Sequence, residues 1–179
     1  MANIIPNAWM PVCRMQRIIV HWTAGGTNPS SNDLVHYHLL LSGSGKLHKG
    51  IPSIKLNSGS VKKESGYAAH TLNCNSGSIG VSLCGMLNAT ENPLFAGKYP
   101  LTEEQWNDAL PQVLAELCQF YNIPITPKTV LTHAEVQKNL GITQRGKWDI
   151  AWLPHNGMRG ADKVGDDMRK RAQEALNQL

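Results

Sequence analysis

The stretch SIGVSLCG, residues 78–85, decides how this chain is expected to fold. It is almost continuously apolar and ends at a glycine, which is typical of a short strand in the centre of a sheet, covered on both faces. The run RIIVHW, residues 17–22, has the same character and is followed by a loop rich in Gly, Ser and Asn. Two further strands, HYHLLL at 36–41 and KLHKGI at 46–51, flank the glycine turn SGSG. These segments predict one sheet built from distant parts of the chain.

Two helices are expected to flank this sheet. The first begins in LTEEQW, where Thr102 and Gln105 form a capping box, and Pro111 should kink it or split it in two. The second covers 161–179 and is amphipathic. The predicted fold class is therefore α/β, a single domain with a central mixed sheet flanked by helices. The Ser-, Gly- and Lys-rich segment 52–78 is expected to be a long surface loop.

Composition narrows the class of protein. The chain has 179 residues, of which 41% are hydrophobic and 17% charged, as is ordinary for one globular domain with a sizeable core. Its net charge of +4 suits a protein that approaches anionic surfaces such as cell walls, but no nucleic-acid-binding motif accompanies it.

No apolar run approaches the ~20 residues that cross a bilayer, and the N-terminus lacks the features of a secretory signal. The four cysteines form no CxxC pair, so we expect reduced, mostly buried thiols.

Three residues far apart in the sequence have the chemistry of a metal site. His21 and His133 each end a short apolar run, RIIVHW and TVLTH, and strand ends at one sheet edge are where distant side chains converge. With Asp149 they form a set of two imidazoles and a carboxylate, which is the ligand type of a catalytic zinc site. The spacing carries no local signature, so packed or hydrogen-bonded histidines are the alternative interpretation.

Lys147 and Asp149, in QRGKWDIAW (144–152), stand two residues apart in a stretch without helical spacing. In an extended backbone, residues i and i+2 point to the same face, so a cation and an anion would project towards one point. A surface ion pair is one interpretation. A metal site with a charged helper beside it is the other.

Five segments occur in the order of a known family: IIVHWTAGG, HYHLLLSGSGKLHKG, AAHTLNCNSGSIGVSLCG, LTEEQWNDAL…YNIP and LTHAEV…GKWD, spanning residues 14–152. They resemble the zinc-dependent N-acetylmuramoyl-L-alanine amidases, the group that contains bacteriophage T7 lysozyme, the AmpD recycling enzymes and the peptidoglycan recognition proteins. The resemblance implies Zn2+ held by His21, His133 and Asp149. Lys147 would then stabilise the oxyanion of the tetrahedral intermediate.

The resemblance also implies supporting roles for three residues. Tyr37, in the YH block, would hydrogen-bond the water or the intermediate at the metal; a half-buried strand tyrosine is the alternative interpretation. His70, in AAHTLN, would contact substrate in the cleft. Thr23, two residues after the first ligand, is assigned to substrate contact as well. The remaining histidines are expected to have no catalytic role: His36, His38, His48 and His155.

The chain departs from the family pattern in two places. Ser82 stands where the recycling branch has a catalytic glutamate, which favours the phage-type arrangement in which Tyr37 and Lys147 assist. The sequence DIAW replaces the Pro-Gly that follows the aspartate in many relatives, so Glu135 and Asp162 are the carboxylates that could stand in for Asp149.

The resemblance predicts an amidase that cuts between the lactyl group of N-acetylmuramic acid and L-alanine of the stem peptide. We expect an endolysin, a monomer made without a signal peptide, that reaches the wall of a Gram-negative host in the periplasm after membrane permeabilisation. The alternatives are a cytoplasmic enzyme that recycles muropeptides, a secreted antibacterial effector and a non-catalytic peptidoglycan recognition module. Transient membrane contact through the basic C-terminal helix is a further, less favoured alternative. The expected parts are an arm at 1–13, a catalytic domain at 14–156 and a helix at 157–179 packed on it or appended to it.

Overall fold

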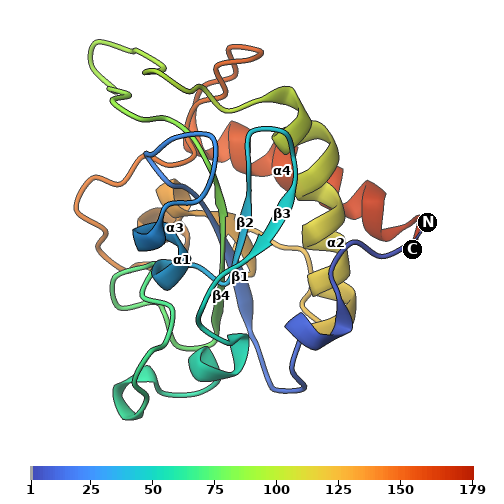
Figure 1. Cartoon of the computed structure of the whole chain (residues 1–179). Coiled ribbons are helices and arrows are strands. Elements are labelled where there is room, and N and C mark those ends of the chain that lie inside the picture. Colours follow the sequence, from blue (N-terminus) through green and yellow to red (C-terminus); the bar gives the residue numbers. More distant parts are fainter. Residues whose placement is uncertain (1) are drawn as a thin grey trace.

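The computed structural model describes residues 2–179, and its centre is one five-stranded sheet (Figure 1). The strands are β1 (Arg17–Trp22), β2 (Leu39–Leu41), β3 (Leu47–Lys49), β4 (Ser78–Leu83) and β5 (Val130–Thr132). Their order in the sheet is β3-β2-β4-β1-β5, with β3 antiparallel to β2 and all other neighbours parallel. The predicted α/β class with a central mixed sheet is confirmed.

The two apolar runs of the sequence form the middle of this sheet. Every residue of β4 is buried, and β1 lies beside it with His21 opposite Ser82. Side chains alternate between the two faces along a strand. In β1, Ile18 and Val20 belong to the large hydrophobic core, whereas Ile19 belongs to a smaller cluster. His21 therefore shares the face of Ile19 and points away from the large core.

Helices cover both faces of the sheet (Figure 1). The long helices α2 (Leu110–Tyr121) and α4 (Ala161–Leu176) pack against each other on one side. The short helices α1 (Ser31–His36) and α3 (His133–Leu140) lie on the other. The described residues 2–179 also form 3-10 helices at η1 (Asn7–Trp9), η2 (Ile54–Asn57) and η3 (Val61–Lys63). The segment 52–78, predicted to be loop, contains η2 and η3.

Pro111 changes the geometry of the first predicted helix without interrupting it. Thr102 and Gln105 make the expected capping box, since each backbone N–H donates to the side chain of the other residue at 2.9 and 3.2 Å. The turns that follow, Glu104–Ala109 (η4), are π-helical, and α2 continues from there with proline in its first turn. Proline has no N–H and its ring crowds the preceding turn, which accounts for the widened segment before it.

Two helices fall where the sequence was expected to form loop or strand. Ser30 and Asp33 exchange hydrogen bonds at the start of α1, and this helix extends to His36, the first residue of the HYHLLL segment. Only the last three residues of that segment, Leu39–Leu41, form a strand. Thr132 and Glu135 form the corresponding capping box of α3, so His133 begins a helix rather than ending a strand. Both boxes are readable in the sequence as Ser/Thr-x-x-Asp/Glu.

The N-terminal residues 2–13 lie along α2. The backbone N–H groups of Ile4 and Ile5 donate to the carboxylate of Glu116, and the Tyr121 hydroxyl donates to the Pro11 carbonyl at 2.8 Å. All four cysteines are free thiols, and three of them are buried. Among residues 2–179, no helix has both the length and the apolar character needed to cross a membrane.

Candidate metal centre

The three residues predicted to bind a metal lie together in the structure. The Nδ1 atoms of His21 and His133 are 3.0 Å apart, and each lies 3.4 Å from a different carboxylate oxygen of Asp149. All three side chains are buried. His21 is near the end of β1 and His133 directly follows β5, so two neighbouring parallel strands deliver both imidazoles to the same sheet edge.

Asp149 is held against the histidines by the backbone and by an aromatic pair. Its carbonyl accepts a hydrogen bond of 2.6 Å from the N–H of Ala134, in the first turn of α3. The preceding residue, Trp148, packs edge-to-face on the buried Trp22 of β1, with ring centroids 4.6 Å apart. The indole pair fixes this loop beside β1 and leaves the residues on either side of Trp148 free to face another direction.

Lys147, on the other side of Trp148, lines the same cleft as Asp149. Its side chain is exposed, whereas that of Asp149 is buried. Within residues 2–179 no ion pair joins the two; the carboxylate contacts the histidines instead. The Lys-Trp-Asp spacing therefore puts a solvent-exposed cation next to a buried carboxylate, and the surface ion pair considered for it is not formed.

The second ring nitrogen of His21 is committed to another histidine. Nε2 of His21 lies 3.0 Å from Nδ1 of His70, and Nε2 of His70 lies 3.2 Å from the carbonyl oxygen of Ser78. A carbonyl can only accept, so His70 carries its proton on Nε2 and accepts at Nδ1. His21 therefore donates from Nε2 and keeps the lone pair of Nδ1 for the side that faces Asp149. The Thr71 hydroxyl, 2.8 Å from His70 Nδ1, can donate and accept and fits the same assignment.

His133 is fixed in the same way by Gln144, a residue that the sequence did not single out. Nε2 of His133 lies 2.7 Å from Oε1 of Gln144, whose own Nε2 donates to the carbonyl of Leu72 at 2.7 Å. Because that carbonyl only accepts, the amide presents its oxygen to His133, and His133 must donate. No sequence pattern marks Gln144, because its role depends on a loop 72 residues away.

The donor set fits a divalent metal ion of the zinc type. Two Nδ1 lone pairs and a carboxylate face one another without a proton to share, which is favourable only around a cation. Metal-binding histidines usually donate their other N–H to a fixed acceptor, as His21 and His133 do here. Burial lowers the pKa of His21 to about 4, against the opposing effect of Asp149, so its ring is neutral at pH 7.

Two further predicted site residues border the same place. Tyr37, directly after α1, has its ring centroid 5.3 Å from that of His21, and burial raises the pKa of its hydroxyl, as does the charge of Asp149. Thr23 accepts hydrogen bonds from the N–H groups of Gly25 and Gly85 at 3.2 and 3.1 Å. Its hydroxyl thus joins the loops that follow β1 and β4.

A cleft of about 1200 Å³ opens over this group. One wall comes from 60–76, within the predicted long loop, and the other from 144–149. Three cationic side chains line it: Lys62, Arg145 and Lys147. The cleft is therefore lined by the buried imidazoles of His21, His70 and His133 and the carboxylate of Asp149, together with three positively charged side chains.

The family model of the N-acetylmuramoyl-L-alanine amidases matches residues 11–155. This chain belongs to that family. The matched region contains the whole sheet and all three members of the metal-binding group, and it ends before α4. No curated protein matches the sequence.

Solved structures resemble this amidase at low sequence identity. The hydrolase AmiA of Staphylococcus aureus, in complex with its ligand, has a TM-score of 0.53 and 18% identity over 93% of this chain and 77% of its own. AmiD of E. coli, in complex with a muropeptide substrate, gives 0.49 and 19% over 73% and 51%. An endolysin of a Thermus scotoductus bacteriophage gives 0.48 and 16% over 84% and 89%. The likeness to AmiA shows a shared fold.

The other residues considered for the amidase site lie elsewhere. Glu135 turns away from the cleft towards Arg169, and Asp162 is exposed in the first turn of α4. Ser82 is fully buried in register with His21, and its hydroxyl has no hydrogen-bond partner among residues 2–179. His38 is buried in contacts with Asn57 and Gly80.

Proposed function

We propose that this amidase hydrolyses the bond between the lactyl group of N-acetylmuramic acid and the L-alanine of the stem peptide, with Zn2+ held by His21, His133 and Asp149. One observation carries the proposal. The Nε2–H groups of both histidines are committed to His70 and Gln144, so both Nδ1 lone pairs face the carboxylate on the floor of the cleft. A catalytic zinc site has three protein ligands and an open position, and the open side here is the cleft.

Zinc bound here would polarise the scissile carbonyl and lower the pKa of a water molecule. The residues of the chain would do the rest. Lys147, an exposed cation on the cleft wall, is suited to donate to the oxyanion that forms on the carbonyl, a contact worth roughly 3 kcal/mol in the transition state. Tyr37, beside His21, supplies a phenolic O–H that can donate to the same developing charge.

We assign His70 two tasks. Its ring nitrogens contact His21 and the Ser78 carbonyl, so it fixes the tautomer of His21 by accepting a hydrogen bond from Nε2 of that ring. It also lines the cleft together with Thr23, where we place the substrate contact.

Within the family we propose the lytic role of an endolysin acting on the cell wall. Ser82 replaces the glutamate of the recycling branch, and the net charge of +4 together with the cationic cleft favours an anionic wall polymer. A recognition module that binds peptidoglycan without cutting it remains the second candidate to test, since it would use the same cleft.

The test is a digest of purified peptidoglycan with and without a chelator, with the released fragments identified by mass spectrometry. His21→Ala and Asp149→Ala are run alongside, and His36→Ala, on α1 outside the metal-binding group, is the matched control. We expect stem peptides with a free L-alanine amine from the wild type and the control, and none with chelator or with either ligand variant. Saccharide fragments would instead identify a glycosidase. Wall that is bound but left intact would identify a recognition module.

A further inference from the structure

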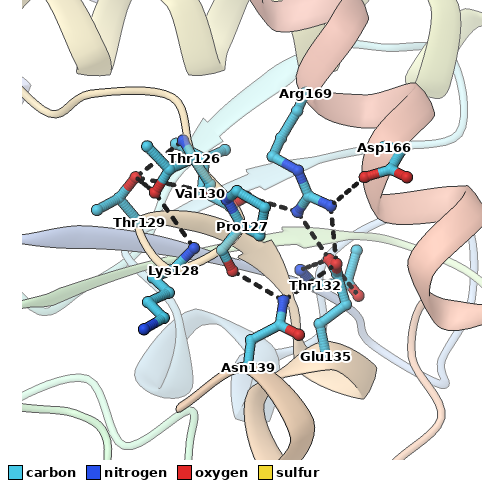
Figure 2. Close-up of polar contacts among 10 residues, drawn as sticks. All are labelled: Thr126, Pro127, Lys128, Thr129, Val130, Thr132, Glu135, Asn139, Asp166 and Arg169. Carbon is cyan, nitrogen blue, oxygen red and sulfur yellow. Dashed lines mark hydrogen bonds and ion pairs between the residues drawn. The ribbon is translucent and has the colours of Figure 1, made fainter.

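A buried ion pair joins α4 to the helix that carries the second ligand (Figure 2). The guanidinium of Arg169 donates to both carboxylate oxygens of Glu135, at 3.1 and 2.9 Å. It also donates to the carbonyl of Val130 in the edge strand β5, at 3.0 Å, and to the exposed Asp166, at 2.9 Å. The side chains of Arg169 and Glu135 are only 9% and 3% exposed, so this is an interior contact rather than a surface one.

Glu135 is also the residue that sets the start of α3. Its carboxylate accepts from the backbone N–H of Thr132 at 3.0 Å and from the Thr132 hydroxyl at 3.3 Å. Asn139, one turn further along, donates to Glu135 at 3.3 Å and to the Pro127 carbonyl at 2.8 Å (Figure 2). His133 lies between Thr132 and Glu135 in the sequence, so the orientation of its backbone is fixed by a carboxylate that α4 holds.

A glycine in the middle of α4 makes room for this contact. A Cβ added at Gly165 would overlap the carboxylate of Glu135. Glycine in a helix interior is unfavourable by about 1 kcal/mol relative to alanine. The close approach of the Glu135 carboxylate to the helix backbone gives a reason for it here.

We propose that Arg169 and Gly165 are positioning residues of the metal centre: α4 holds Glu135, and Glu135 holds the first turn of α3 so that Nδ1 of His133 meets His21 and Asp149. This inference rests on the proposed function. It also means that the catalytic unit extends beyond residue 155, where the family match ends, and includes α4. The basic residue Arg169 of this helix then has a role inside the domain rather than at a membrane surface.

The first experiment compares Arg169→Met and Arg169→Lys with Arg171→Met. Arg171 is the matched control, because it pairs with Asp167 at 2.9 Å on the same helix and, among residues 2–179, makes no hydrogen bond or ion pair with α3. Zinc affinity of each folded protein is measured by competition with a chromophoric chelator, and the spectrum of the cobalt-substituted protein reports the ligand geometry. We expect Arg169→Met to bind zinc at least 10-fold more weakly, Arg169→Lys to recover part of this loss, and Arg171→Met to bind like the wild type.

Gly165→Ala keeps the inference testable if Arg169→Met does not fold. If α4 were merely a packing element, the overlap of the added methyl with Glu135 would lower the stability of the protein but leave the zinc affinity of the folded protein unchanged. If α4 positions His133, the added methyl displaces Glu135 and zinc affinity falls several-fold while the protein stays folded.

The outcomes separate the two proposals. A wild type that binds no zinc would overturn the proposed function and this inference with it. A wild type that binds zinc, with Arg169 and Gly165 variants indistinguishable from Arg171→Met, would overturn this inference alone.

Discussion

Replacing His38 with asparagine should make the stability of the protein less sensitive to mild acid. Nδ1 of His38 accepts from the N–H of Gly80, and Nε2 donates to the side-chain oxygen of Asn57, both at 3.0 Å. A second proton on the ring would place two donors face to face at Gly80. Burial lowers the pKa of His38 to about 4; the hydrogen bond to Asn57 opposes this effect and the charge of Lys49 adds to it.

The size and sign of the effect follow from this pKa. A fall from 6.5 in the unfolded chain to about 4 corresponds to roughly 3 kcal/mol of folding free energy. Between these values the unfolded state binds more protons than the folded state. The stabilisation is therefore complete above pH 6.5 and is lost as the pH falls from 6.5 towards 4.

The pH dependence of the free energy of unfolding can be measured by urea unfolding, followed by tryptophan fluorescence. Chelator is present throughout, and the pH is varied between 6.5 and 4. At neutral pH His38→Asn should be less stable than the wild type, because it loses the bond to Asn57. That deficit should shrink by roughly 3 kcal/mol towards the acid limit. His70, whose ring centroid is 6.0 Å away, is present in both proteins, so its own titration largely cancels.

Ile79→Val, which removes one methylene from the core and has no titratable group, should lower the free energy of unfolding by about 1 kcal/mol at every pH. A His38→Asn deficit as constant as that of Ile79→Val would refute the reasoning.

Three further substitutions probe the ligand partner, the cleft and the core. Gln144→Leu should weaken zinc binding about 10- to 100-fold in a chelator competition, because His133 loses the acceptor that fixes its tautomer; unchanged affinity would contradict this. Lys147→Met should lower kcat on purified peptidoglycan about 100-fold while zinc affinity stays the same; a parallel loss of zinc would instead indicate a role in the metal site. Leu114→Ala, in the fully buried face of α2, should lower the free energy of unfolding by about 2–5 kcal/mol in urea, whereas Phe120→Ala, at a position 39% exposed, should cost much less.

The parts of the fold that could be predicted are those whose cause is local. An apolar run such as 78–85 needs cover on both faces wherever it lies, so β4 could be placed in the middle of the sheet from its own residues. His21 and His133 could be paired because both follow such runs. The helices α1 and α3 were missed because six and eight residues carry little amphipathic pattern, although their capping boxes were present in the sequence.

The partners of the ligating histidines could not be predicted, because they depend on chain segments that meet only in the fold. Gln144 reaches the Leu72 carbonyl, and His70 reaches the Ser78 carbonyl. Arg169 reaches Glu135 across 34 residues. In each case the side chain could hydrogen-bond equally well elsewhere, so its type and spacing contain no information about where it binds.

The segment 70–78 connects these observations. It is the end of the segment 52–78, which was expected to be a long surface loop, yet its carbonyls at Leu72 and Ser78 terminate both of the hydrogen-bond chains that set the tautomers of His21 and His133. The side chain of Asn75 holds it by accepting from the backbone N–H groups of His70 and the next residue at 2.9 and 2.8 Å. The ring of His70 then lies so close to β4 that a Cβ at Gly80 would come within 2.6 Å of it. Gly80, in the middle of the buried strand, therefore leaves the space that the ring of His70 needs to orient His21.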